Sequence, residues 1–262
     1  MVRSTAQSDW RTAYSERFYE SKPGWKSLYD QWCELVSTHL IENSTVLEIG
    51  GGSTLNLTRL LRPKAERLIG LDVDPVIQNN ALLDLPVVYD GENFSGIPDA
   101  SIDVAVADWV NEHIENPAMH FREVGRVLKP GGCYIFRTVN LYHYKALGAC
   151  LIPHAVQVPL ARWLRQSAPD AYDPYKVFYR ANTRRRIETL CAEAEMEVGS
   201  FRTIESVPAY GWGARPLFFL FMAYERLVNL SPRFAPLRHT ILCVAKKTHR
   251  PSLGHVDVSQ SS

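Results

Sequence analysis

Three consecutive glycines, Gly50 to Gly52, directly follow a short apolar run, Val46 to Ile49. Glycine lets the backbone turn sharply and approach a ligand, and a helix that starts after such a turn points its free N–H groups at that ligand. Asp72 ends the next apolar run, where a carboxylate can accept hydrogen bonds from both ribose hydroxyls of a nucleoside. Because Leu55 stands where a nicotinamide-binding turn needs its third glycine, we expect a nucleoside ligand other than a nicotinamide dinucleotide.

The surrounding elements alternate between short apolar runs and helix-period segments, which is typical of a parallel sheet with crossover helices. A helix is predicted to begin near Pro75, and Lys129-Pro130-Gly131-Gly132 is expected to end another before a strand begins. Asn182 or Thr183 can cap a later helix. The predicted strands cover residues 46–49, 68–72, 86–90, 102–108, 133–138, 197–204 and 240–245.

Composition limits the function classes. The chain has 262 residues, and its 29 basic residues almost balance 28 acidic ones, so the charge gives no reason to expect a nucleic acid partner. The five cysteines form no CxxC pair, which favours reduced thiols over a zinc or redox site. The polar N-terminus lacks the apolar core of a secretory signal, and the longest apolar run, Leu217 to Tyr224, is far shorter than the roughly 20 residues of a membrane span. We therefore expect a cytoplasmic protein without a transmembrane segment.

Four motifs in order resemble the class I S-adenosylmethionine-dependent methyltransferases, in particular the type 11-like group that methylates small molecules. They read VLEIGGGS, LIGLDVDP, VVYDGENFSGIPDASIDVAVADWVNEHIENP, and REVGRVLKPGG followed by YIFRTVN, between about Val46 and Asn140. The resemblance implies a doubly wound α/β fold with a mostly parallel seven-stranded sheet, a helical and aromatic lid, and S-adenosylmethionine as the cofactor.

The same resemblance assigns cofactor-binding roles along the motifs. Gly50, Gly51 and Gly52 would line the methionine part, with Glu48 bracing the loop or the ammonium group. Asp72 would hold the ribose. The remaining assignments are Val73 on the adenine, Asp90 at the adenine amino group with Gly91 and Glu92 alongside, and Asp108 with Trp109 near the sulfonium.

The methyl group of a sulfonium is already activated, so the protein need only align an acceptor, exclude water and, for a hydroxyl, remove a proton. Histidine is the side chain best suited to that step near neutral pH. His113, His143 and His154 are the candidates, although His113 can also serve the loop structure and His143 can anchor an aromatic lid. No metal site is expected, since Asp108, Glu112 and His113 belong to the cofactor motif.

The acceptor is expected to be a small molecule bound between aromatic segments, such as a natural product, a sugar or a quinone-like compound, methylated on oxygen. The predicted organisation is an N-terminal helical cap at 1–40, a cofactor-binding core at 41–140, a lid at 141–181, the rest of the core with an acceptor-side insertion at 182–248, and a tail at 249–262. The stretch LGACLIPHAVQVPLARWL leaves peripheral membrane contact open.

Methylation of a protein or a nucleic acid is a further possibility within the enzyme class, and two alternatives from other classes remain. The first is a methyltransferase-like protein that binds the cofactor without turnover, because an intact glycine loop says nothing about catalysis. The second is a nicotinamide-dependent reductase, which Leu55 disfavours. The sequence does not decide the acceptor, the methylated atom or the oligomeric state.

Overall fold

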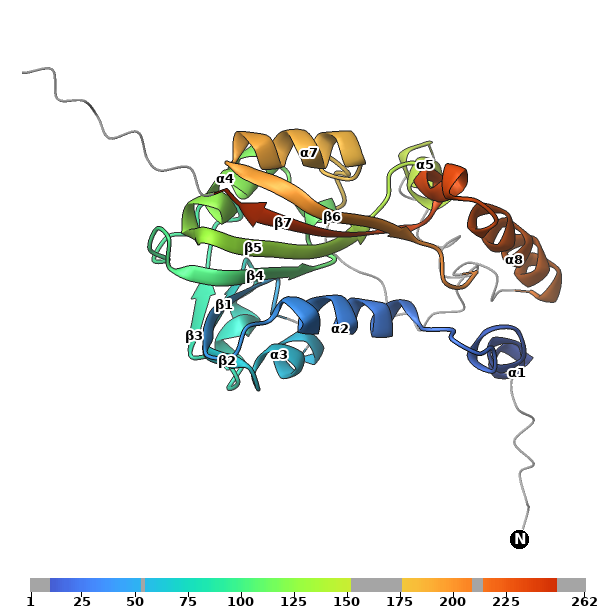
Figure 1. Ribbon diagram of the computed structural model, residues 1–262, viewed down its shortest axis with the longest axis horizontal. Helices are drawn as coiled ribbons and strands as arrows, with labels where there is room; N and C mark the ends of the chain where they lie inside the picture. The colour runs from blue at the N-terminus through green and yellow to red at the C-terminus, as the bar shows by residue number, and fades with distance from the viewer. Residues whose placement is uncertain (1–9, 53–54, 152–175, 209–213, 249–262) are drawn as a thin grey trace, which may run out of the picture.

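Seven strands form one sheet in the order β3-β2-β1-β4-β5-β7-β6 in the computed structural model, which describes residues 10–52, 55–151, 176–208 and 214–248 (Figure 1). β1 to β5 run parallel, and β7 lies antiparallel between β5 and β6. This arrangement confirms the predicted doubly wound fold. The strands are β1 (Ser44–Ile49), β2 (Ala65–Asp72), β3 (Leu85–Val88), β4 (Ile102–Asp108), β5 (Leu128–Val139), β6 (Met196–Ile204) and β7 (Thr240–Lys247).

Both faces of the central strands are buried, which explains their continuous apolar runs. Along β1, Val46 faces one cluster, which contains Trp32 and Val36 of α2 (Leu28–His39). The adjacent Leu47 faces the other cluster. Further helices that cover the faces are α3 (Asn56–Leu61), α4 (Pro117–Val127) and α7 (Arg184–Glu193).

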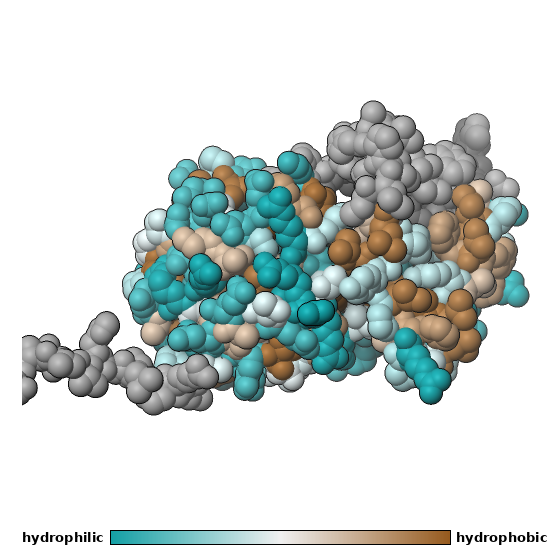
Figure 2. Space-filling view, turned by 90° about the horizontal axis from the view of Figure 1, so that it is seen from above, coloured by the Kyte–Doolittle hydropathy of each residue, from teal (hydrophilic) through white to brown (hydrophobic). Residues whose placement is uncertain are grey.

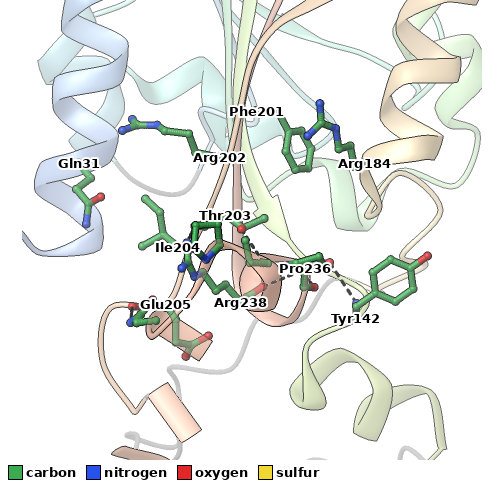
Figure 3. Close-up of a pocket in the computed structure, with 14 residues that line it drawn as sticks. Gln31, Tyr142, Arg184, Phe201, Arg202, Thr203, Ile204, Glu205, Pro236 and Arg238 are labelled. Carbon is green, nitrogen blue, oxygen red and sulfur yellow. Dashed lines mark hydrogen bonds between the residues drawn. The ribbon is translucent and has the colours of Figure 1, made fainter. Parts of the chain in front are cut away.

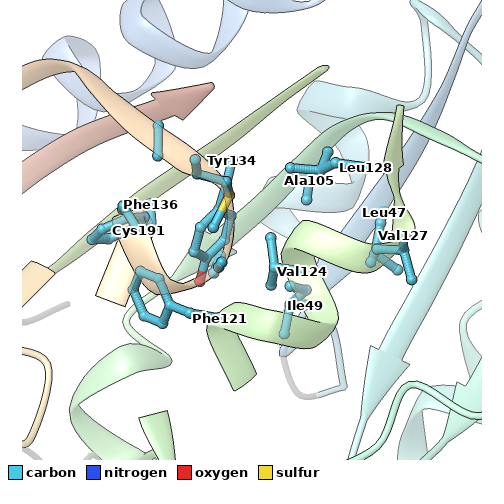
Figure 4. Packing of buried hydrophobic residues seen from close by; sticks show 14 of the residues in the cluster. Leu47, Ile49, Ala105, Phe121, Val124, Val127, Leu128, Tyr134, Phe136 and Cys191 are labelled. Atoms are coloured by element: carbon cyan, nitrogen blue, oxygen red, sulfur yellow. The ribbon is translucent and has the colours of Figure 1, made fainter. Parts of the chain in front are cut away.

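Figure 1 shows α2 and α3 on one side of the sheet and α4 and α7 on the other. Figure 4 shows the second cluster, where Phe121 and Val124 of α4 pack toward Leu47 and Tyr134 of the sheet. Helices on both faces leave only the ends of the strands for a ligand, and the carboxyl ends of β1 to β4 all meet at one edge.

Aromatic packing gathers three other helices beyond one end of the sheet. These are α1 (Trp10–Ser15), α5 (Tyr144–Leu151) and α8 (Arg215–Asn229). The ring of Tyr144 stacks on Phe221 at 5.2 Å between centroids, and Tyr14 lies 5.2 Å from Phe218. Two segments far apart in the sequence therefore both pack on α8. The remaining short helices are η1 (Glu16–Glu20), η2 (Pro75–Asn79), η3 (Asn111–His113) and η5 (Pro232–Leu237).

The local predictions agree with the structure except at a few boundaries. Pro75 opens η2 with Asp74 as its cap, and Thr183, rather than Asn182, caps α7. The strand after α4 begins at Leu128, before Lys129-Pro130-Gly131-Gly132, because Leu128 pairs with Ile102 and the four residues form an irregular segment before Cys133 pairs with Val104. Much of the expected lid, including the candidate base His154, and the expected tail lie outside the described residues, and the domain boundaries stay a prediction.

Candidate functional site

The glycine turn follows β1 at the carboxyl edge of the sheet and contacts residues at the ends of the neighbouring strands. Gly50 has φ +82°, a conformation that side chains strongly disfavour, and its N–H donates to the carbonyl of Leu71 at 2.7 Å. A Cβ atom on Gly50 would lie 2.4 Å from Cγ2 of Val110, and one on Gly52 would lie 2.7 Å from Oδ2 of Asp72. Only glycine fits at these two positions, so the turn stays narrow and close to β2 and β4.

Asp72 is buried at the end of β2 and held by two backbone N–H groups. Its Oδ2 accepts from Gly52 at 2.7 Å, and its Oδ1 accepts from Asp74 at 2.8 Å. Each carboxylate oxygen can still accept a further hydrogen bond. The carboxylate is therefore preoriented for a ligand with two adjacent donors.

Glu48 is a second buried carboxyl beside the turn, and its Oε2 has no hydrogen-bond partner in the described part of the chain. Burial raises the pKa of Glu48 to about 7, against the opposing effect of a hydrogen bond with Thr58. A cationic group placed at Oε2 would supply the missing partner and favour the ionised form. This carboxyl therefore suits a ligand ammonium group.

The loop after β3 carries Asp90, Gly91 and Glu92. Oδ1 of Asp90 accepts from the backbone N–H groups of Asn93 and Glu92 at 2.9 and 2.8 Å, and these bonds lower the pKa of Asp90. Asp90 thus stabilises its own loop, with Glu92 exposed beside it. Gly91 has φ +91°, and a Cβ there would lie 3.7 Å from Cγ1 of the exposed Val73. The loop therefore passes beside Val73.

Asp108 ends β4 and Trp109 follows it, and Arg137 of β5 contacts both residues. Its guanidinium forms a two-pronged ion pair with Asp108, with Nη2 donating to Oδ2 at 2.8 Å and Nε donating to Oδ1. The same guanidinium lies 5.2 Å from the ring centroids of Trp32 and Trp109. Trp109 has φ +57°, an unusual conformation for a bulky residue and typical of functional sites. The sequence interpretation did not include Arg137, although a lone arginine in an apolar strand run was a usable signal.

Glu112 and His113 tie η3 to the chain around residues 176–179. The buried Glu112 accepts from Oγ1 of Thr138 at 2.7 Å, and its carbonyl accepts from the N–H of Phe178 at 2.8 Å. Burial raises the pKa of the Glu112 carboxyl. Nδ1 of His113 lies 2.9 Å from the carbonyl of Lys176, so that nitrogen donates. This pair braces a loop, which is the structural role considered for it above.

His143 lies fully buried after β5, in a different network from His113. Its Nδ1 accepts from the N–H of Lys145 at 3.3 Å, so the ring proton of the neutral form is on Nε2, which lies 3.3 Å from Oε2 of Glu205. The His143 ring is 4.9 Å from the ring of His239. His113 and His143, two of the predicted bases, are therefore not brought together, and His143 instead contacts His239.

His239 lines a cavity of about 330 Å³ at the same end of the sheet. The backbone N–H of His239 donates to Oε2 of Glu205 at 2.7 Å, and the His239 ring lies 5.9 Å from the ring of Trp109. The sequence placed a strand at 240–245 but not its direction. Because β7 runs antiparallel, its first residues lie at the edge where β1 to β4 end. The cavity is lined by Trp25, Ser27, Leu28, Tyr29, Ile204, Glu205, Ser206, Val207, His239 and Thr240.

A larger cavity of about 650 Å³ lies along the second half of β6 (Figure 3). Arg202 and Gln31 lie on one side of this strand and Arg184 and Phe201 on the other. No residue of the glycine turn or of β1 to β4 lines it. Among the described residues, no group of three or more His, Cys, Asp or Glu side chains is placed to hold a metal ion.

Residues 47–136 match the methyltransferase domain family. A probable S-adenosylmethionine-dependent methyltransferase of Mycolicibacterium smegmatis is 33% identical over 115 residues, 39% of this chain and 40% of the relative. The mitochondrial ubiquinone biosynthesis O-methyltransferase of Dictyostelium discoideum is 27% identical over 172 residues, 56% of this chain and 53% of the relative. The chain therefore spans about half the length of these curated relatives.

The crystal structure of the YcgJ protein of Bacillus subtilis superimposes with a TM-score of 0.55 at 15% identity, covering 84% of this chain and 99% of that one. This likeness supports the fold. The family match is confined to residues 47–136, and in that part it indicates a class I S-adenosylmethionine-dependent methyltransferase domain of the type 11 kind, whose cofactor is S-adenosylmethionine. Among the described residues, no helix is long and apolar enough to cross a membrane.

Proposed function

We propose that this chain transfers the methyl group of S-adenosylmethionine to a hydroxyl oxygen of a small molecule, such as a natural product, a sugar or a quinone-like compound. The observation that carries the proposal is the pair of buried carboxyls beside the glycine turn. Asp72 is oriented by two backbone N–H groups, and Glu48 has an unpaired oxygen. Ribose hydroxyls and a methionine ammonium are the groups that these two carboxyls fit.

The other cofactor assignments follow the same edge. Gly50, Gly51 and Gly52 would allow the methionine part to approach the backbone, with no room for a side chain at Gly50 or Gly52. Val73 and the loop of Asp90, Gly91 and Glu92 would border the adenine, and Asp108 with Trp109 would lie near the sulfonium. When bound, the cofactor supplies a methyl group that needs no further activation.

We assign the acceptor to the smaller cavity. His239 and Glu205 provide polar groups in a cavity otherwise bordered by apolar and aromatic side chains, which suits an amphipathic molecule with one reacting hydroxyl. The ring contact between His239 and Trp109 supports this assignment, because Trp109 is the residue that we propose near the sulfonium. The larger cavity on β6 has no comparable link to the cofactor residues.

Proton removal is assigned to His239, with His143 and Glu205 as positioning residues. Lys145 Nζ lies 3.2 Å from Nε2 of His239, and Nδ1 of the same His239 ring lies 2.8 Å from Oγ1 of Thr240. An ammonium only donates, so Nε2 carries the lone pair that a base needs. The acceptor hydroxyl would take the place of Lys145 at Nε2. His113 remains an alternative base, although its bond to the Lys176 carbonyl favours a bracing role.

The cofactor site is tested by calorimetric titration of S-adenosylmethionine and S-adenosylhomocysteine into the wild type and Asp72→Ala. Loss of charge-assisted hydrogen bonds to the ribose is expected to weaken binding about 10- to 100-fold. Asp99→Ala, which changes an exposed aspartate outside the site, is the control and should bind as the wild type does. Equal affinity in Asp72→Ala and the wild type would refute the assignment.

A second assay distinguishes the proposed methyl transfer from the alternative, in which the protein binds the cofactor without turnover. Release of S-adenosylhomocysteine is measured with panels of phenols, quinols, sugars, thiols and amines. Release with hydroxyl acceptors supports the proposal. Release only with thiols or amines would contradict the oxygen assignment, and tight binding without release across the panel would favour the non-catalytic alternative.

A further inference from the structure

α8 has apolar side chains on both its inner and its outer face. Phe218 and Val228 are fully buried, and Glu225 points inward to accept from the hydroxyl of Tyr19 at 3.1 Å. Phe219 is half-exposed and packs against the rings of Tyr14 and Phe18. On the outer face, Leu220, Ala223 and Leu227 are exposed. Their spacing of three, four or seven residues places them in one stripe along the helix. A helix that needed only to pack on the sheet domain would carry polar residues there.

The apolar stripe continues beyond the end of α8. Leu230, which follows the helix, is 75% exposed, more than Leu220 at 62%. Phe234 and Leu237 of η5 are also exposed, and the hydroxyl of Tyr224 donates to the carbonyl of Leu237 at 2.6 Å, which holds η5 against α8. Figure 2 shows hydrophobic side chains gathered over the end of the molecule that holds α8. The stripe is thus one surface of two elements, here called the α8–η5 face.

The exposed charges of α8 and η5 themselves all have one sign, whereas the neighbouring η1, whose Phe18 contacts Phe219, carries the exposed Glu16, Arg17 and Glu20. Between residues 215 and 238 the charged residues are four arginines and Glu225, and Glu225 is buried and hydrogen-bonded. Arg215, Arg226 and Arg233 are exposed. A second copy of the chain docked on this face by a twofold axis would bring arginine-ringed surfaces against each other, which opposes self-association. Exposed leucines and Phe234 together with arginines, and no exposed acid on α8 or η5, match an anionic lipid surface.

We propose that the α8–η5 face docks on an anionic lipid bilayer, with its apolar stripe in the headgroup region and its arginines on the lipid phosphates. With 15 residues, α8 is too short to span a bilayer and would lie parallel to the surface. This inference uses residues distinct from those assigned to the cofactor and does not depend on methyl transfer.

The test is co-sedimentation of the full chain with vesicles of phosphatidylcholine alone and of phosphatidylcholine mixed with phosphatidylglycerol. Binding is expected to the mixed vesicles, to fall with added salt, and to be about tenfold or more weaker on phosphatidylcholine alone. Leu220→Ser with Leu227→Ser should reduce binding about tenfold or more, and Arg215→Glu with Arg233→Glu should do the same. Ile41→Ser changes a leucine-sized residue that is 65% exposed outside this face, and should bind as the wild type does.

Each variant must retain the wild-type melting temperature and affinity for S-adenosylhomocysteine, which separates a lost surface from a lost fold. Failure of the wild type to sediment with the mixed vesicles at low salt would overturn the proposal. Binding that survives both double substitutions would also overturn it. A concentration-dependent dimer in analytical ultracentrifugation that Leu220→Ser abolishes would identify a second copy as the occupant instead.

Discussion

At the scale of single residues, two buried carboxyls with opposite surroundings lie at the proposed cofactor end of the site. Asp72 receives two backbone N–H groups, whereas Glu48 is buried with one oxygen unpaired. A carboxyl whose pKa rises from about 4.3 to about 7 destabilises the folded state at higher pH, because the unfolded chain ionises first. Glu48 therefore lowers the stability of the folded protein at higher pH. Its unpaired oxygen is also a position where a cationic group of a ligand could bind.

Glu48→Gln is expected to stabilise the free protein at alkaline pH and weaken cofactor binding. The stability cost of Glu48 is absent below the unfolded pKa and is complete above about pH 7, so the variant should gain about 2 to 3 kcal/mol relative to the wild type between about pH 5 and about pH 8. Urea denaturation at the two pH values measures this change, and calorimetry should show about tenfold weaker S-adenosylmethionine binding.

Glu42→Gln provides the control, because Glu42 is exposed just before β1. Its effect on the free energy of unfolding should be the same at both pH values. A Glu48→Gln effect that did not change with pH would contradict the proposed origin of the raised pKa.

At the scale of elements, α4 and α7 pack so closely that the contact admits no side chain. Gly125 of α4 faces the end of α7, and a Cβ there would lie 2.4 Å from the carbonyl oxygen of Ala194. This contact holds the two helices over the same face of the sheet. It leaves the carboxyl ends of the strands as the place where a ligand can approach.

Gly125→Ala is expected to destabilise the protein by about 1 to 3 kcal/mol, because the backbone of α7 must move away. This loss should appear although alanine favours a helix more than glycine does. Gly148→Ala in α5 is the matched control, since a Cβ there meets nothing within 4 Å, and it should be neutral or stabilising. Urea denaturation of both variants decides the point, and equal effects would contradict the packing argument.

At the scale of the whole molecule, the proposed acceptor end is assembled from distant parts of the chain. His143 follows β5, Glu205 follows β6, and His239 precedes β7, yet the three side chains form one contact network. The 330 Å³ cavity adds Trp25 and Ser27, which lie before α2, and Leu28 and Tyr29 of its first turn. The proposed cofactor end, in contrast, uses consecutive strands of one continuous motif region.

His239→Gln is therefore expected to lower kcat for a hydroxyl acceptor about 100-fold or more, with little change in KM for S-adenosylmethionine. Its pH–rate profile should also lose the limb that reports deprotonation of the base. His143→Gln should have a smaller effect on kcat, and His39→Gln on α2 should have none. Unchanged turnover in His239→Gln with loss in His143→Gln would assign the base to His143.

The local parts of this structure were predictable because they depend on short-range patterns. The β-branched run before Gly50, the glycine turn and Asp72 at the end of its strand lie within one strand–turn–helix–strand unit, so their spacing specifies their arrangement. The resemblance in motif order then led to the fold and the cofactor. Small errors arose where pairing with a neighbouring strand decides a boundary, as at Leu128 and Ile102.

What the sequence by itself determined about this protein is the sheet, the glycine turn and the position of Asp72 beside it at the proposed nucleoside end of the site, since local conformation and strand order set them. Only the tertiary structure decided that β7 runs antiparallel and brings His239 beside Trp109, or that Arg137 pairs with Asp108. The same holds for the outer stripe of α8. A helix that has apolar residues on two faces does not reveal from its periodicity which of them its neighbours will bury.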